Sequence, residues 1–281
     1  MIALSRVTFP VEPLVKRVCI FGFFERSDLY PRSDQLISAV SNCFDETVVL
    51  AAGREGSDRN FDYQHSFIGI VRRSLGTARD FLRLLGNRKM LSEADVIFLP
   101  YPAYFGLIAF QLLWTFRKTR PLVLADAFLC LHDTVVHDRK IAKSGSLVAK
   151  LVGWLEGRTL SEADHLFIDT PQQKAALVRR YGMAAQKFTV TPVGIDESVW
   201  RPLAAQEFKS EFRVIFWGTF IPLHGVATIV SAANIVSTVR PAVKFQLVGN
   251  GQCAPEIEAL LNSTQLTNLH WTRQLISGKE L

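Results

Sequence analysis

The stretch FRVIFWGTFIPLHGVATIVSAANIV (residues 212–236), followed by VKFQLVGNGQ (residues 243–252), decides the fold class. Apolar, β-branched and aromatic residues fill positions 212–217 and 243–248, which predicts two buried strands. A helical pattern follows each strand, over residues 226–239 and around residues 254–261. The segment therefore predicts two consecutive strand–loop–helix units of an α/β sheet.

Each of these strands ends in a glycine-containing loop, the first from Gly218 to Gly225 and the second from Gly249 to Gln252. Glycines there let backbone N–H groups approach a phosphate, and the N-terminus of the next helix favours negative charge. Two such loops side by side suit a diphosphate, although each glycine alone is also typical of an ordinary tight turn. The predicted ligand-binding residues are Gly218, Thr219, His224, Gly225, Gly249 and Gly251.

These loops resemble the donor domain of the retaining, family 4 glycosyltransferases of the GT-B fold. The first loop stands where that family has G-R-x-x-x-x-K-G, and the second stands where it has G-x-G. Three further motifs are similar to the family's: Thr191-Pro192-Val193-Gly194-Ile195-Asp196, Trp200-Arg201-Pro202 and Tyr30-Pro31-Arg32. Thr219 and His224 replace the family's arginine and lysine, which contact the donor diphosphate. A histidine can still donate a hydrogen bond, but it is a weaker phosphate anchor than lysine.

The resemblance implies a GT-B-like α/β fold with two Rossmann-like, doubly wound domains, the second of them incomplete. Residues 1–196 would form the acceptor-side domain, residues 197–211 a linker, and residues 212–281 a partial donor domain. The family's E-x7-E region would lie beyond Leu281. We therefore expect either a part of a longer or split enzyme or a truncated, non-catalytic fragment.

The implied function is transfer of a sugar from a nucleoside-diphosphate sugar to an acceptor hydroxyl, with retention of configuration. The expected acceptor is a saccharide or a lipid-linked precursor of a bacterial cell-envelope polysaccharide. The scheme needs no cofactor and no metal, because backbone amides and side chains bear the diphosphate. A dinucleotide oxidoreductase is disfavoured, since the bulky Phe21-Gly22-Phe23-Phe24 follows the first strand in place of G-x-G-x-x-G.

The first two thirds of the chain alternate between strand and helix patterns, which predicts a doubly wound parallel sheet. The predicted strands are residues 17–24, 47–50, 96–99, 122–126, 165–169 and 187–191. The predicted helices are residues 33–43, 66–90, 104–116, 147–161 and 172–181. Residues 96–116 carry no charge and are long enough to span a bilayer. Pro100 and Pro102 interrupt them, however, which favours a strand, a loop and a helix over one membrane helix.

Candidate catalytic residues follow the strand at residues 122–126. Asp126 ends it, and a polar loop is predicted over residues 131–140. A carboxylate there could accept the acceptor's proton, so Asp126 and Asp133 are predicted as catalytic, with His132, His137 and Arg139 on the acceptor side. The alternative is a loop cap at Asp126 beside a solvated cluster of ion pairs. A metal hydrolase is disfavoured, because histidines five residues apart do not share a helical face well.

The net charge of +6 indicates an anionic partner. Residues 66–90 predict a helix with six basic side chains against one acidic residue, beside an apolar side. Such a helix suits anionic lipid headgroups, and a solvated basic face on a core helix is the equal alternative. No aromatic–basic motif supports nucleic-acid binding. Four scattered cysteines, without a signal peptide, favour a cytoplasmic protein. Docking through the basic helix would place it at the inner face of the membrane.

Overall fold

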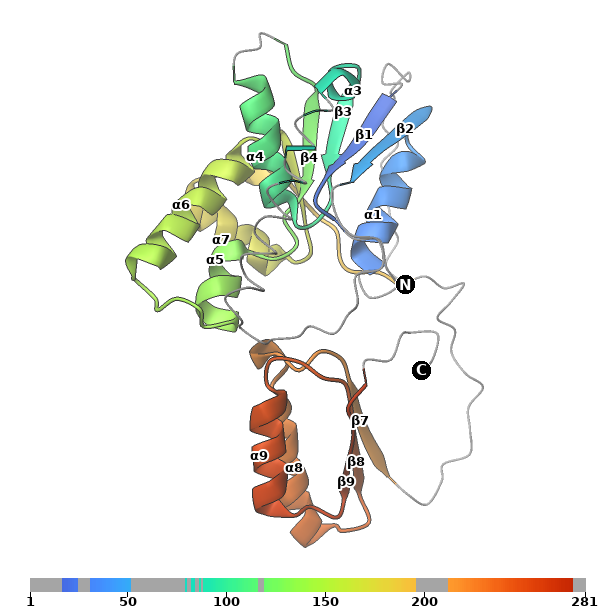
Figure 1. Ribbon diagram of the computed structural model, residues 1–281, viewed down its shortest axis with the longest axis vertical. Coiled ribbons are helices and arrows are strands. Elements are labelled where there is room, and N and C mark those ends of the chain that lie inside the picture. Colours follow the sequence, from blue (N-terminus) through green and yellow to red (C-terminus); the bar gives the residue numbers. More distant parts are fainter. Residues whose placement is uncertain are drawn as a thin grey trace.

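The protein is described by a computed structural model that contains two separate parallel β-sheets, each with helices packed on it (Figure 1). The structure describes residues 17–24, 31–51, 79, 82, 83, 86, 88–115, 119–195 and 212–274. The helix predicted over residues 66–90 falls mostly outside these ranges. The described α3 covers Arg88–Ser92 and overlaps only the end of the predicted helix.

The first sheet has six parallel strands in the order β2-β1-β3-β4-β5-β6. Their bounds are Arg17–Gly22 (β1), Glu46–Ala51 (β2), Val96–Leu99 (β3), Leu122–Asp126 (β4), His165–Ile168 (β5) and Phe188–Val190 (β6). All four residues of β3 are buried, which explains their unbroken apolar sequence, since a parallel sheet is covered on both faces. The order reverses between β1 and β3, and ligands of such sheets bind outside the carboxyl ends of the strands at this point.

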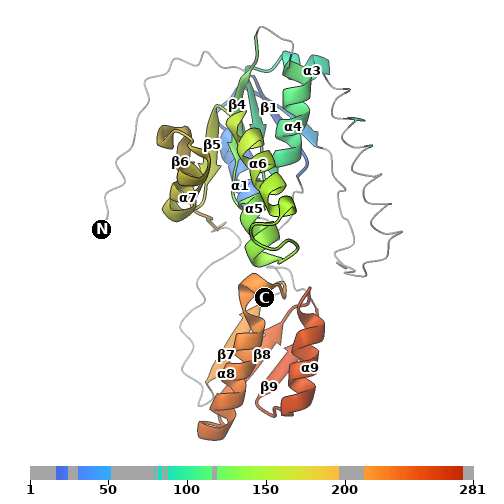
Figure 2. The same cartoon turned by 90° about the vertical axis from the view of Figure 1, so that its left-hand side faces the viewer.

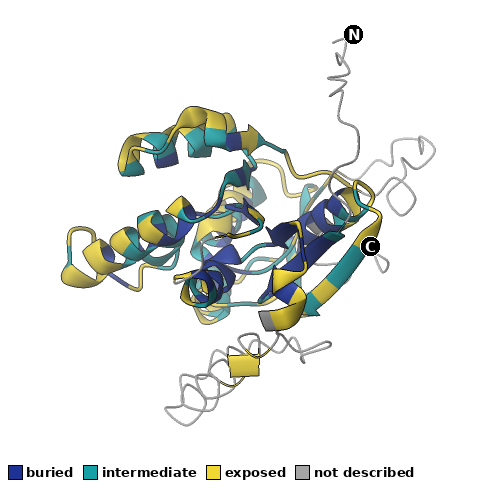
Figure 3. Ribbon diagram, turned by 90° about the horizontal axis from the view of Figure 1, so that it is seen from above, coloured by how far each residue is buried: buried dark blue, intermediate teal, exposed yellow. Residues whose placement is uncertain are grey.

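Helices cover both faces of this sheet (Figure 2). One face carries α1 (Pro31–Ser41), whose Leu36, Ile37 and Val40 pack against Val18 and Phe98. The other face carries α4 (Ala103–Trp114), α6 (Leu147–Ser161) and α7 (Pro171–Tyr181). Viewed from above, the buried residues gather along the strands and the inner helix faces, while the outer faces of the helices are exposed (Figure 3). The predicted doubly wound parallel sheet is confirmed.

The second sheet has three parallel strands in the order β7-β8-β9. Their bounds are Arg213–Trp217 (β7), Lys244–Val248 (β8) and Leu269–Thr272 (β9). The helices α8 (Val226–Val239) and α9 (Ala254–Thr264) pack on it around Phe220, Val230 and Ile257. Both strand–loop–helix units of the opening sequence are therefore confirmed, and β9 was not predicted.

Two apolar stretches have the composition of a membrane span. Residues 96–116 divide into β3, a cis peptide bond at Tyr101–Pro102, and α4, so the predicted strand, loop and helix are confirmed. Among the described helices, Pro222–Val239 is long and apolar enough to cross a membrane, with a mean hydropathy of 1.3. Its first turn ends at Gly225, whose φ is 60°, and its buried Val226, Val230 and Ala233 recur on one face, as in a helix packed on a sheet.

The polar loop predicted over residues 131–140 is wrong for most of its length. A short helix, α5 (Leu131–Asp133), runs directly into a π-helical turn, η1 (Thr134–Asp138). The backbone N–H of Arg139 donates to the carbonyl of Thr134 over 2.8 Å, which is the five-residue spacing of a π-helix. The structure also contains the short 3₁₀ turns η2 (Ala185–Lys187) and η3 (Pro222–His224).

Candidate functional site

The two glycine loops touch each other beyond the carboxyl ends of β7 and β8. The N–H of Gly218 donates to the carbonyl of Val248 over 2.9 Å, and the N–H of Phe220 donates to the carbonyl of Asn250 over 3.0 Å. A Cβ atom on Gly249, whose φ is 145°, would lie 1.9 Å from the carbonyl oxygen of Gly218. A Cβ atom on Gly251, whose φ is 158°, would lie 2.7 Å from the carbonyl oxygen of Phe220. Both glycines are thus required for the backbone approach of one loop to the other.

The N-terminus of α8 opens beside these loops. The first backbone N–H groups of a helix have no partner within it, and the helix dipole favours an anion there. His224 lies in the last position of η3 and is exposed. Its Nδ1 atom is 2.5 Å from the carbonyl oxygen of Thr219. Because a carbonyl only accepts, Nδ1 carries the hydrogen, and Nε2 can donate to an anion only when the ring is protonated.

Asp126 lies at the end of β4 and is buried against Arg32. The Arg32 guanidinium donates to both carboxylate oxygens over 2.9–3.2 Å, and also to the carbonyl of Thr191 over 2.5 Å. It lies 4.9 Å from the ring centroid of Phe128. Burial raises the pKa of Asp126, and the hydrogen bonds and charge of Arg32 oppose that rise. The carboxylate thus links the start of α1 to the end of β4. Arg32 was not predicted as a site residue, although the sequence analysis identified its Tyr30-Pro31-Arg32 motif.

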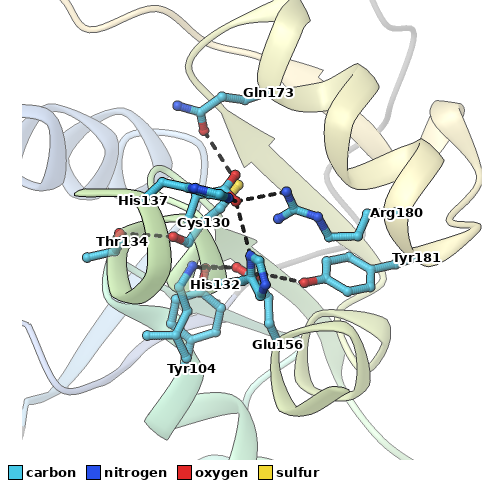
Figure 4. Close-up of polar contacts among 11 residues, drawn as sticks. Tyr104, Cys130, His132, Thr134, His137, Glu156, Gln173, Arg180 and Tyr181 are labelled. Carbon is cyan, nitrogen blue, oxygen red and sulfur yellow. Dashed lines mark hydrogen bonds and ion pairs between the residues drawn. The ribbon is translucent and has the colours of Figure 1, made fainter. Parts of the chain in front are cut away.

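Polar side chains of α5, η1 and α7 form a cluster, in which Figure 4 labels His132, His137 and Arg180. Asp133 joins these three residues. Its Oδ1 atom accepts from Nη2 of Arg180 over 2.8 Å and lies 3.2 Å from Nδ1 of His132. Nε2 of His137 lies 3.9 Å from the same oxygen. Burial acts to raise the pKa of Asp133, but the hydrogen bonds and charges of Arg180 and His132 outweigh it and lower the pKa. Three predicted residues, His132, Asp133 and His137, are therefore brought together.

The wholly buried carboxylate of Glu156 supports this cluster from below, and it was not predicted (Figure 4). It accepts from the hydroxyls of Tyr104 over 2.9 Å and Tyr181 over 2.5 Å, and from the N–H groups of Leu131 over 2.5 Å and His132 over 3.3 Å. Burial, with the nearby Glu156 charge, raises the pKa of Tyr104 well above its ordinary value. Glu156 is the one acidic residue of α6, which is the sequence signal that could have identified it.

The end of η1 contacts both glycine loops. The carboxylate of Asp138 accepts from the N–H of Leu223 over 3.1 Å, and Nη1 of Arg139 donates to Oε1 of Gln252 over 3.1 Å. Asp138 and Arg139 also form an ion pair of 3.2 Å. The structure thus places the predicted acceptor-side segment beside the predicted diphosphate loops, whereas Asp126 is engaged elsewhere, with Arg32.

Comparison with known proteins gives one family match. The sequence profile described as "Glycosyl transferase 4-like domain" matches residues 32–194, more than half of the chain. The chain is 32% identical over 107 residues to a D-inositol 3-phosphate glycosyltransferase of Segniliparus rotundus, covering 36% of this chain and 23% of that protein. It is 28% identical over 99 residues to the protein of the same description from Paenarthrobacter aurescens, covering 33% of this chain and 24% of that protein. The matched region thus spans about a quarter of the length of these relatives.

Solved structures match over nearly the whole chain and show the fold. The Anabaena protein HepE, determined in complex with UDP, has a TM-score of 0.57 at 12% identity, covering 94% of this chain and 70% of that one. WaaG, described as a glycosyltransferase involved in lipopolysaccharide biosynthesis, has a TM-score of 0.57 at 14% identity, covering 95% of this chain and 72% of that one. These likenesses confirm the predicted GT-B-like fold.

Proposed function

We infer the activity of this chain from its family: the chain belongs to the glycosyl transferase 4-like family. We propose that it transfers a sugar from a nucleoside-diphosphate sugar to an acceptor hydroxyl, with retention of configuration. The observation that carries the proposal is the contact between the two glycine loops and the end of η1. Because of that contact, the candidate diphosphate site in the glycine loops lies next to the candidate acceptor site around α5 and η1.

On the donor side, the N-terminus of α8 and the loop residues Gly218, Thr219, Gly225, Gly249 and Gly251 would hold the diphosphate. Preorganised N–H groups there stabilise the negative charge that develops on the leaving group. Nε2 of a protonated His224 would add one donor to the same anion. These groups need no metal ion to bear the diphosphate.

On the acceptor side, Asp133 is the better placed of the two predicted catalytic carboxylates. It is half-buried within the polar cluster, while Asp126 is 1% exposed and held by Arg32. We propose that Asp133, with His132, His137 and Arg139, positions the acceptor hydroxyl. We propose that Asp126 has a structural role and positions Arg32 at the carboxyl edge of the sheet.

Titration of UDP- and GDP-sugars into the 281-residue chain, followed by calorimetry, tests the donor site. We expect saturable binding by one nucleotide class, which His224→Ala weakens several-fold and His270→Ala leaves unchanged. His270 is the matched control, because it is also exposed but lies on β9. Release of nucleoside diphosphate in the presence of acceptor extends the same assay to turnover. Absence of binding by every nucleotide sugar would refute the donor site.

We further propose peripheral contact with an anionic membrane, which would bring a lipid-linked acceptor to the site on the cytoplasmic side. The predicted helix over residues 66–90 lies mostly outside the described residues, but an exposed surface on α6 and the preceding loop supports the same idea. Its large apolar side chains are Ile141, Leu147, Val148, Leu151 and Trp154. Exposed basic side chains lie on the same two segments, at Lys140, Lys143, Lys150 and Arg158. Exposed apolar side chains together with lysine and arginine suit anionic headgroups.

Sedimentation with liposomes tests this contact. We expect the protein to sediment with vesicles that contain anionic lipid at low salt, and to remain in solution with neutral vesicles. Trp154→Glu combined with Leu151→Glu should abolish sedimentation. Leu112→Glu is the matched control, because Leu112 is an exposed apolar residue on α4, outside this surface. Equal sedimentation of all three proteins would refute membrane contact through α6.

A further inference from the structure

The cluster of His132, Asp133 and His137 brings nitrogen and oxygen ligands together within 4.8 Å. In an α-helix, residues five apart point about 140° away from each other. The wider π-helical turn of η1 removes most of that divergence, and the two imidazole rings lie 5.9 Å apart between centroids. The sequence argument against a shared face for these histidines is therefore wrong. Such π-turns are rare and frequently occur at functional sites.

The separations fit one small divalent cation. Ligand atoms bound tetrahedrally at about 2.0–2.1 Å lie roughly 3.4 Å from one another. Nδ1 of His132 and Oδ1 of Asp133 are already 3.2 Å apart. Nε2 of His137 lies 3.9 Å from the same oxygen, and its side chain is 61% exposed, so a small side-chain rotation can bring it closer.

Two of the three ligands are held in place by their surroundings. The backbone of His132 is bound to the buried Glu156. A Cβ atom at Gly153 would come within 3.3 Å of the His132 ring, so the glycine leaves the ring its space. Arg180 donates to Oδ1 of Asp133, and a carboxylate oxygen has a further lone pair for a metal. Partners that orient the ligand side chains in this way are typical of metal sites.

We propose that His132, Asp133 and His137 bind one zinc ion, with water or a further ligand in the open position. Two imidazoles and one carboxylate favour zinc-type cations over Mg²⁺ and Ca²⁺, which select oxygen ligands. Zinc binding would be an additional property of these three residues, because the transfer proposed above needs no metal. Because the ion would occupy residues that we place beside the acceptor, zinc binding is also expected to inhibit the transfer.

Calorimetric titration of Zn²⁺ into the chelator-treated protein tests the proposal. Cys43 is an exposed thiol and a competing ligand, so every protein carries Cys43→Ser. We expect one ion per chain, and at least tenfold weaker binding for His132→Gln and for His137→Gln. His270→Gln is the matched control and should bind as tightly as the parent. Mg²⁺ should produce no saturable signal.

Cobalt substitution supplies a readout that does not depend on catalysis. Co²⁺ at the site should give visible absorption bands that Zn²⁺ displaces and that are absent from His137→Gln. Circular dichroism of each variant without metal shows that it is folded. The proposal is overturned if no ion binds, if both cluster variants bind Zn²⁺ like the parent, or if the Co²⁺ bands persist in His137→Gln. Zinc binding without loss of transfer would contradict only the expected inhibition.

Discussion

Arg32→Met breaks the buried ion pair with Asp126 and should destabilise the first sheet strongly. The two side chains are 5% and 0% exposed, and the substitution leaves the carboxylate without a cation. Removing one partner of a buried pair typically costs about 3–5 kcal/mol. Asp126 can avoid this cost by taking up a proton. Protonating a carboxyl with the ordinary pKa of 3.8 at pH 7 costs about 4 kcal/mol, since each pH unit above the pKa adds about 1.36 kcal/mol. We therefore expect a loss of roughly 3–4 kcal/mol at pH 7.

The same reasoning fixes the sign of the pH dependence. Burial raises the pKa of Asp126 in the folded state, and loss of Arg32 should raise it further. A carboxyl with a raised folded-state pKa stabilises the protein below its unfolded pKa, and this contribution is lost as the pH rises through the folded pKa. The cost of Arg32→Met should thus shrink to about 2 kcal/mol at pH 5, where protonation is easier.

Urea unfolding followed by circular dichroism at pH 5 and pH 7 measures both numbers. Arg32→Met combined with Asp126→Leu removes both charges and should recover most of the stability, since apolar replacement of a buried pair is often close to neutral. An equal cost at the two pH values, or a double variant as unstable as the sum of the single ones, would refute this account. Turnover by the double variant also decides whether Asp126 is catalytic, because a structural carboxylate can be replaced without loss of activity.

Three further substitutions are expected to act through contacts described above. Gly249→Ala should abolish nucleotide binding measured by calorimetry, because its methyl group would meet the carbonyl of Gly218 at a positive φ. Glu156→Leu should cost about 2–3 kcal/mol in urea unfolding, because the half-buried Tyr181 hydroxyl and the His132 N–H lose their acceptor, whereas the Tyr104 hydroxyl can still donate to the carbonyl of Leu129. Trp271→Phe should cost about 1 kcal/mol, measured in the same way, because its Nε1–H donates to the carbonyl of Gly249 over 2.9 Å.

Continuous apolar strands and helix caps are the features that the sequence predicted best. The bounds predicted for β3, β4, α6 and α8 agree with the structure. Thr170 and Pro171 are a local start signal of this kind: the hydroxyl of Thr170 accepts from the N–H of Gln173, and Pro171 takes the first helical position of α7. These signals are local, so one sequence contains them in full.

Contacts between distant segments were missed for the opposite reason. Arg32 and Asp126 are 94 residues apart, and only the order of strands in the sheet brings the start of α1 to the end of β4. The short β9 has little pattern of its own and is defined by its pairing with β8. A single sequence without related sequences contains no signal for either contact.

The π-turn shows how one backbone detail joins the parts of the candidate site. Polar composition favoured a loop for residues 131–140, but Glu156 binds the first N–H groups of α5 and thereby starts a helix there. The extra residue in the η1 turn then sets the directions of the side chains that follow it. If η1 were an ordinary α-helical turn, His137 and Asp138 would each rotate by about 100° around the axis. The same rotation would separate His137 from Asp133 and remove Asp138 from the N–H of Leu223. The grouping of the candidate metal ligands and the contact of Asp138 with the donor loop therefore depend on the same turn.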